Sequence, residues 1–256
     1  MRKKQYSTIT AAVCGLIFGL DIYFGRYFIY LSFLLVAVIS GLGIYQYRHK
    51  ALTKSGFSQY LLIPICYGLG ALMFVRLFVL PFQLLWAGII IFVFYQVIQL
   101  LDRVNEKTVA PRTIIMFALL AYFFIMLFGF NSLMLYGLPG VVIVLFTFAV
   151  TYLIADYLQS NTLSPDRRIS LVGSLLMAEL SWVLSNWNSF YPYRPSLVVG
   201  VSFSALLMTV VMYWGWSLWY ERNMGRLTKK VSLEYFLIAG SVIIVLFLTS
   251  NWSRID

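Results

Sequence analysis

Glu179 is the residue of this chain whose chemistry most needs an explanation. It is the only Asp or Glu near the middle of a long apolar stretch. An ionisable side chain inside a membrane costs at least a few kcal/mol, so it should face protein or water and have a partner, or be held protonated. The residue therefore predicts either a polar site or a structural contact between helices.

The residues around Glu179 recur with helical spacing on two faces. Glu179, Trp182 and Asn186 are three and four residues apart, which places them on one face of a helix. Small residues recur on nearly the opposite face, and such a stripe is typical of close helix packing in membranes. The stripe consists of Ser170, Ser174, Ala178, Ser181 and Ser185. We expect this stripe to dock a neighbouring helix, and Glu179, Trp182 and Asn186 to face a polar pocket.

Arg76 is the basic residue that we expect to join Glu179 in this pocket, which would open toward the outer side. It stands at the end of another apolar stretch, only four apolar residues before Pro81. Asp21, Arg26 and Arg194 are also expected in the outer half, where solvation at the membrane interface explains them. Glu179 is equally compatible with a structural clamp that hydrogen-bonds a neighbouring helix.

Familiar catalytic and cofactor motifs are missing from the sequence. The single histidine, His49, lies in a basic segment, which argues against histidine-ligated metal or haem and a Ser-His relay in the membrane. No P-loop and no paired carboxylates are present, and Cys14 and Cys66 each lie inside an apolar stretch. We therefore predict no metal, no cofactor and no catalytic residue.

Long apolar helices must position these side chains. Hydrophobic residues make up 61% of the 256 residues and charged residues only 11%, against about 25% charged in soluble proteins. Because a helix needs about 20 apolar residues to cross a membrane, the sequence predicts an all-α polytopic transmembrane bundle forming a single domain, 1–256. The nine predicted spans are 7–23, 28–47, 59–78, 82–101, 113–130, 138–158, 169–186, 195–220 and 233–249. Eight would remain if the first, which resembles a secretory signal, is not a span.

The basic residues predict the orientation. Of the nineteen Lys and Arg residues, all but Arg26, Arg76, Arg194 and Arg254 fall in the segments that share a side with the N-terminus. By the positive-inside rule, the N-terminus is cytoplasmic and the C-terminus is outside. The net charge of +10 is spread over short connectors, so we expect anionic lipid headgroups as partners and no nucleic acid. The expected lipid contact is the basic tetrad Arg222, Arg226, Lys229 and Lys230.

Short motifs in the C-terminal third carry a resemblance. The segment Ala178-Glu179-Leu-Ser-Trp182, then Pro192, then Gly225-Arg-Leu-Thr-Lys-Lys230 before a last aliphatic stretch, resembles an uncharacterised family of bacterial polytopic integral membrane proteins. The resemblance implies that Glu179, Trp182 and Pro192 form a recurrent feature. It implies no activity and no substrate.

These observations favour a non-enzymatic protein of the bacterial plasma membrane. The leading prediction is a small-solute or lipid carrier with an outward-facing polar pocket at Glu179. The alternative is a membrane scaffold or assembly subunit, in which Glu179 is an interhelical clamp and the chain contacts a protein partner or a second copy. An intramembrane enzyme of unfamiliar type is the third choice.

Overall fold

The computed structural model describes residues 3–24, 28–50, 61–76, 80–104, 111–136, 139–162, 167–185, 190–191 and 201–249. Within these ranges the chain is all-helical apart from one antiparallel pair of two-residue strands, β1 (Phe190–Tyr191) and β2 (Val201–Ser202). The helices are α1 (Lys3–Tyr23), α2 (Phe28–Lys50), α4 (Ile63–Val75), α5 (Leu80–Val104), α6 (Pro111–Tyr136), α7 (Gly140–Thr162), α8 (Arg167–Ser185), α9 (Phe203–Asn223) and α10 (Lys229–Thr249). The predicted all-α class is confirmed.

Each of the nine predicted spans overlaps one of these helices, and the ends differ by several residues. Helix α4 is shorter than its predicted range and carries Pro64 in its first turn, where a missing amide hydrogen has no cost. Helix α9 begins at Phe203 because Ser202 is extended and its hydroxyl accepts a hydrogen bond from the Ala205 amide at 3.4 Å. Helix α6 continues past the predicted end and includes Asn131, which is buried.

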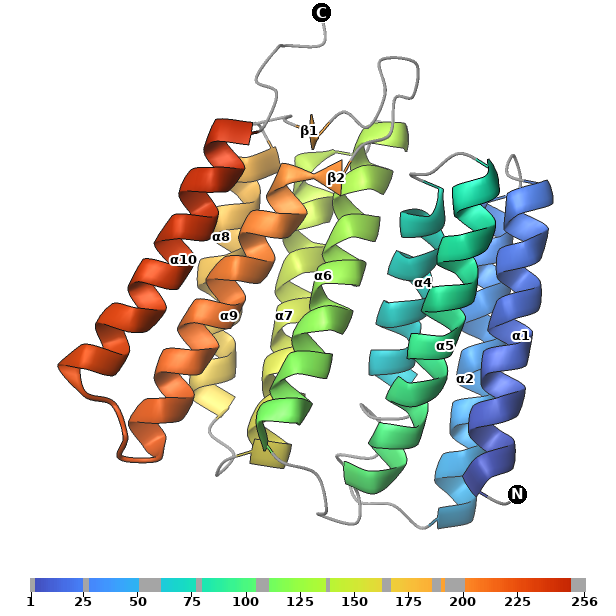
Figure 1. Ribbon diagram of the computed structural model, residues 1–256, viewed down its shortest axis with the longest axis horizontal. Coiled ribbons are helices and arrows are strands. Elements are labelled where there is room, and N and C mark those ends of the chain that lie inside the picture. Colours follow the sequence, from blue (N-terminus) through green and yellow to red (C-terminus); the bar gives the residue numbers. More distant parts are fainter. Residues whose placement is uncertain are drawn as a thin grey trace, which may run out of the picture.

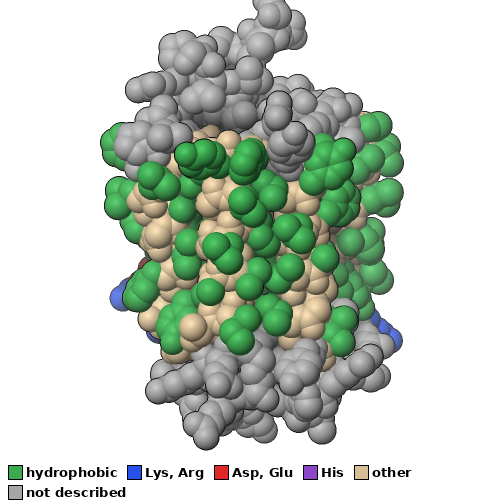
Figure 2. All heavy atoms as spheres, turned by 90° about the vertical axis from the view of Figure 1, so that its right-hand side faces the viewer, with side chains coloured by type: hydrophobic (Ala, Val, Ile, Leu, Met, Phe, Trp, Pro, Cys, Tyr) green, Lys and Arg blue, Asp and Glu red, His purple; other side chains and the backbone are tan. Residues whose placement is uncertain are grey.

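Five helices are long and apolar enough to cross a membrane. They contain the segments Phe82–Gln99, Pro111–Ser132, Gly140–Ser160, Arg168–Ser185 and Lys229–Leu248. Among the residues with defined placement, α1, α2 and α4 supply shorter apolar helices. Large apolar side chains such as Leu16 and Phe33 are about 70% exposed, and Figure 2 shows hydrophobic side chains covering the middle of one face. Proteins in water rarely expose so much contiguous apolar surface, so the apolar exposed surface of these helices indicates a membrane protein.

The helices stand side by side, with α6 near the centre (Figure 1). Helix α6 packs against α4, α7 and α9, while α5 and α2 contact α1 at one edge and α10 packs mainly on α9 at the other. Helix α1 begins at the lower end of the view and α10 finishes at the upper end (Figure 1). The two ends of the helical array therefore lie on opposite sides.

The junction between α4 and α6 is the closest helix contact that we find. A Cβ atom at Gly70 of α4 would overlap the backbone carbonyl of Phe124 in α6. Beside it, the Tyr67 ring stacks on Phe94 of α5 at 5.2 Å between centroids and meets Phe124 edge-on at 4.8 Å. The glycine permits the approach, and the aromatic rings fill the space around it.

Candidate functional site

A groove lies between α7, α8 and α9, with a volume of about 470 Å³. We call it the α7–α8–α9 groove. Its walls include Thr151 and Ala155 from α7, Val172 and Leu176 from α8, and Trp216 from α9, and they are almost entirely apolar. The volume falls within the range of about 300–1,000 Å³ that is usual for small-molecule sites.

Two glycines keep the groove open. Gly173 of α8 and Gly215 of α9 both line it. At either position, no atom of the described chain lies within 4 Å of where a Cβ would stand. Helix α8 packs extensively on α7 but only lightly on α9. The groove is therefore the space that remains between α8 and α9, which contact each other only lightly.

The walls carry few polar groups, and two of these, the indole nitrogens of Trp214 and Trp216, are buried without a hydrogen-bond partner among the described residues. The Thr151 hydroxyl lies 3.1 Å from the Tyr122 hydroxyl, within hydrogen-bond distance. The Trp216 ring packs against Trp219, with 4.9 Å between centroids. Because little polar surface faces the cavity, a ligand would bind mainly by burying apolar area.

Arginine residues lie at one end of the groove. Arg168, in the first turn of α8, lines it and is exposed. Arg222 of α9 is also exposed, and it follows Gly215 by seven residues and Trp219 by three, so it lies on the same face of α9. Helix α8 begins and α9 ends on the lower side of the view (Figure 1). One end of the apolar groove therefore carries the guanidinium group of Arg168, and Arg222 follows on the groove-facing side of α9.

The length of the groove matches one half of a bilayer. Along α8 it runs from Arg168 to Met177, which at about 1.5 Å per residue spans roughly 14 Å. The hydrocarbon core of a membrane is about 30 Å thick. A groove that starts at the interface would thus end near the middle of the membrane.

Glu179 lies beyond the other end of the groove and does not line it. The carboxyl is on the exposed surface of α8, beside Leu175, Trp182 and Val183, which are 49%, 51% and 49% exposed. No hydrogen bond or ion pair joins it to any residue whose placement is defined. The sequence led us to expect this carboxyl in a pocket, whereas it faces outward; Asn186 is outside the described residues.

Arg76 is not close to Glu179. Its Nε atom donates to Oδ2 of Asp21 at 3.0 Å, so the C-terminal ends of α4 and α1 are joined by an ion pair. The Asp21 side chain is only 1% exposed, which corrects the expectation that solvent accounts for it. Helices α4 and α8 lie on opposite sides of α6 and α7 (Figure 1). Arg26 and Arg194 are outside the described residues.

The small-residue stripe of α8 is turned inward. Ser170, Ser174, Ala178 and Ser181 are buried, and α7 is the helix that α8 contacts most. The Ser174 and Ser181 hydroxyls donate to carbonyls of their own helix, at Ser170 and Ala178 respectively. The Ser170 hydroxyl is buried without a hydrogen-bond partner among the described residues. Ser185 lies close to Gly140, the first residue of α7. The small side chains thus allow a close approach of α8 to α7, and the Ser174 and Ser181 hydroxyls are paired within α8.

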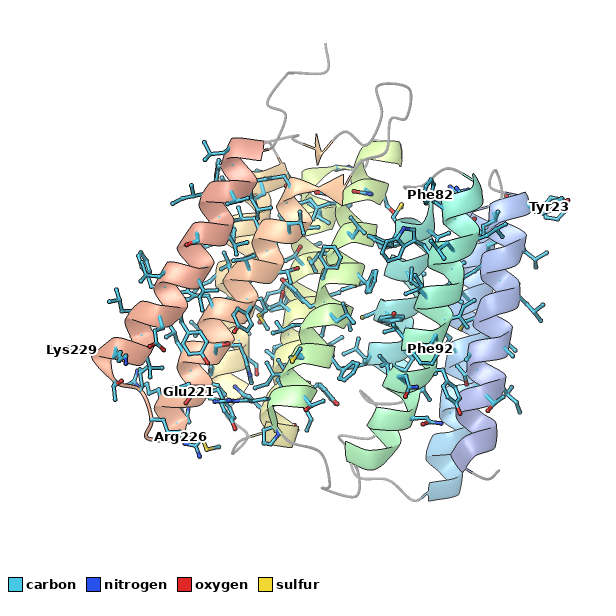
Figure 3. All side chains as sticks on the ribbon, in the orientation of Figure 1. Tyr23, Phe82, Phe92, Glu221, Arg226 and Lys229 are labelled. Carbon is cyan, nitrogen blue, oxygen red and sulfur yellow. The ribbon has the colours of Figure 1, made fainter. Side chains whose placement is uncertain are left out.

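The basic tetrad Arg222, Arg226, Lys229 and Lys230 is exposed at the turn between α9 and α10. Gly225 makes this turn with φ +67, and the Arg226 amide donates to the Glu221 carbonyl at 2.9 Å. Figure 3 shows Glu221, Arg226 and Lys229 together at this end. The Glu221 side chain is buried, 3.6 Å from the Arg112 guanidinium. The sequence did not indicate that Glu221 is buried, because it stands next to basic residues in what looks like an exposed charged segment.

Comparison with known proteins gives no relative for this chain: no protein-family model, no curated protein and no solved structure matches it. Any functional conclusion therefore depends on the geometry of the chain itself.

Proposed function

We propose that this protein is a polytopic membrane protein that binds a phosphate-bearing lipid, with the acyl chain in the α7–α8–α9 groove. The observation that carries the proposal is an apolar groove of about 470 Å³ with Arg168 in its wall at one end and Arg222 nearby on α9, while no basic residue that the structure describes lines the other end. A lipid has the same asymmetry, because an anionic headgroup is attached to one end of a hydrocarbon chain.

The nine helices would form nine spans, with the N-terminus in the cytoplasm. In this orientation Arg168 and Arg222 lie at the level of the cytoplasmic headgroups, where basic side chains meet anionic lipid. The groove then follows the inner leaflet toward its centre. The exposed tetrad at the α9–α10 turn would contact neighbouring headgroups on the same side.

Between the two carrier functions that the sequence predicts, the groove favours a lipid over a small polar solute. A polar solute needs hydrogen-bonding groups in the wall to replace its water. Thr151 is already within hydrogen-bond distance of Tyr122. An acyl chain needs none, and gains about 25 cal/mol for each Å² of apolar surface that it buries.

Filling the groove provides the test. In Gly215→Leu, the new side chain would occupy space that the lipid chain needs. Gly88→Leu of α5 is the matched control, because it is also an exposed helical glycine with open space around its Cβ position in the described structure. Native mass spectrometry of purified protein with added phosphatidylglycerol should show at least about tenfold weaker binding for Gly215→Leu only. Equal binding by both variants would contradict the proposal.

Removing the guanidinium groups tests the headgroup end. Each basic residue near an anionic headgroup contributes about 1 kcal/mol, so Arg168→Ala and Arg222→Ala should each weaken binding by roughly fivefold. Arg226→Ala removes the same charge from the same basic surface but outside the groove. Because Arg226 would contact neighbouring headgroups and not the lipid in the groove, Arg226→Ala should weaken binding less than Arg168→Ala or Arg222→Ala. An equal loss in all three variants would favour nonspecific attraction.

A second candidate function, an assembly subunit, is favoured by α10. Its apolar segment is the least buried of the five long apolar helices, and it exposes Leu233, Phe236 and Leu237 by more than half. A partner helix would bury this surface. Crosslinking from Phe236 in native membranes would give a defined protein adduct if α10 binds a partner, and only lipid adducts if it does not.

A further inference from the structure

Glu179 and Arg168 are two charged residues on one face of α8. Eleven residues separate them, which is about three helical turns, so they lie nearly in line and roughly 16 Å apart along the axis. If Arg168 lies at the cytoplasmic interface, Glu179 lies near the middle of a membrane about 30 Å thick. The two charges are opposite in sign.

The exposed face of α8 that carries Arg168 and Glu179 also forms one wall of the groove. Val172 and Leu176 line the groove, and Glu179 follows Leu176 by one turn on the same face. A lipid held in the groove therefore has the carboxyl of Glu179 directly beyond the end of its binding site. A headgroup that moved along α8 would leave the guanidinium groups and reach this carboxyl next.

The surroundings of Glu179 point to a ligand rather than to a structural role. The side chain is exposed, its neighbours on that face are apolar, and it has no partner among the residues that the structure places. A carboxyl that faces hydrocarbon raises the free energy of membrane insertion, so it needs a compensating partner there. It would be stabilised by a group that brings a positive charge and hydrogen-bond donors into the membrane.

We infer that Glu179 is a transient binding site, near the middle of the membrane, for the ammonium group of an aminophospholipid, and that the protein moves such lipids between leaflets along α8. This inference depends on the proposed lipid-binding function. The phosphate of the headgroup would be held by Arg168 and Arg222 at the cytoplasmic side. During crossing, the carboxylate of Glu179 would accept hydrogen bonds from the ammonium group and neutralise its charge where water is absent.

The test is lipid translocation by the full-length protein in reconstituted vesicles. Acyl-labelled fluorescent phosphatidylethanolamine is compared with acyl-labelled phosphatidylglycerol, which lacks the amine, and dithionite bleaching reports the outer leaflet. The wild type should move phosphatidylethanolamine faster, and Glu179→Leu should slow it by about tenfold or more. Glu179→Asp should retain part of the rate. Val183→Leu, a conservative change on the same exposed face, should leave it unchanged.

Two further outcomes separate this inference from the proposed function. Glu179→Leu should still bind lipid in native mass spectrometry, because the carboxyl does not line the groove. Wild-type binding without translocation, or equal rates for wild type and Glu179→Leu, would overturn the inference and leave the lipid site intact. Loss of an oligomer in Glu179→Leu with unchanged translocation would show that the carboxyl contacts a partner protein instead.

Discussion

Gly70→Ala should be among the most damaging conservative substitutions in this protein. At this position a Cβ would overlap the carbonyl group of Phe124 in α6. A backbone group cannot rotate away, so α4 would have to shift relative to α6. Overpacking usually costs about 1–3 kcal/mol, and alanine recovers up to about 1 kcal/mol through its better helix propensity. Because the obstacle is a backbone group, the overpacking cost should lie near the upper end of this range, about 3 kcal/mol, which leaves a net loss of roughly 2 kcal/mol.

Thermal unfolding of purified protein in mild detergent measures this loss. For a chain of this size, about 2 kcal/mol corresponds to a fall in Tm of roughly 4–8 °C. Gly88→Ala is the matched control, because a Cβ there meets no atom of the described residues, and its Tm should equal or exceed that of the wild type. If Gly70→Ala and Gly88→Ala had the same Tm, the close contact between α4 and α6 would be refuted.

Three other predictions concern packing, an ion pair and topology. Ser174→Leu should lower stability by about 1–3 kcal/mol in the same melting assay, because this residue is completely buried in the stripe of α8. Asp21→Asn and Arg76→Gln should each destabilise by roughly 2 kcal/mol, and the double variant by less than their sum, because each single change leaves a partner of a buried pair uncompensated. In intact cells, a membrane-impermeant thiol reagent should label Pro139→Cys and not Leu227→Cys.

Each of these experiments has a matched control or a contradicting result. Ser241→Leu enlarges an exposed serine whose hydroxyl also bonds to its own helix, and it should leave the Tm unchanged. Strict additivity in the ion-pair cycle would show that Asp21 and Arg76 do not interact. Since Cys14 and Cys66 are buried, the wild type should stay unlabelled. Labelling at position 227 from outside would reverse the proposed orientation.

The helices could be predicted from the sequence because a bilayer demands them. An apolar stretch of about 20 residues in lipid must form a helix to satisfy its backbone hydrogen bonds. The polar residues that interrupt the hydrophobic sequence therefore mark where each helix ends. The small-residue stripe could be recognised for a similar reason. Spacings of three and four between Ser170 and Ser185 define one face of a helix, whatever its neighbour.

Contacts between distant helices could not be predicted in the same way. Asp21 and Arg76 are 55 residues apart, and each alone looks like an interfacial charge. Gly70 and Gly88 are both glycines in apolar stretches, yet only Gly70 touches another backbone. Which glycine matters depends on how the helices cross, and hydrophobicity carries no information about that.

The groove was beyond sequence reasoning because it belongs to no single helix. The spacing from Arg168 through Val172 and Leu176 to Glu179 was present in the sequence. That spacing describes one wall of a groove only because Gly215, on a different helix, leaves the adjoining space open. The sequence therefore drew attention to the carboxyl on α8 and gave no sign of the cavity beside that helix.

Photocrosslinking with a phospholipid that carries a diazirine near the middle of one acyl chain tests the central claim most directly. After irradiation in vesicles, the adducts are mapped by mass spectrometry of the digested protein. Adducts concentrated in residues 168–177 and 211–219, and lost in Gly215→Leu, are the predicted result. Adducts spread over the exposed apolar surfaces of α1, α2 and α5, with no enrichment in the groove, would contradict the account.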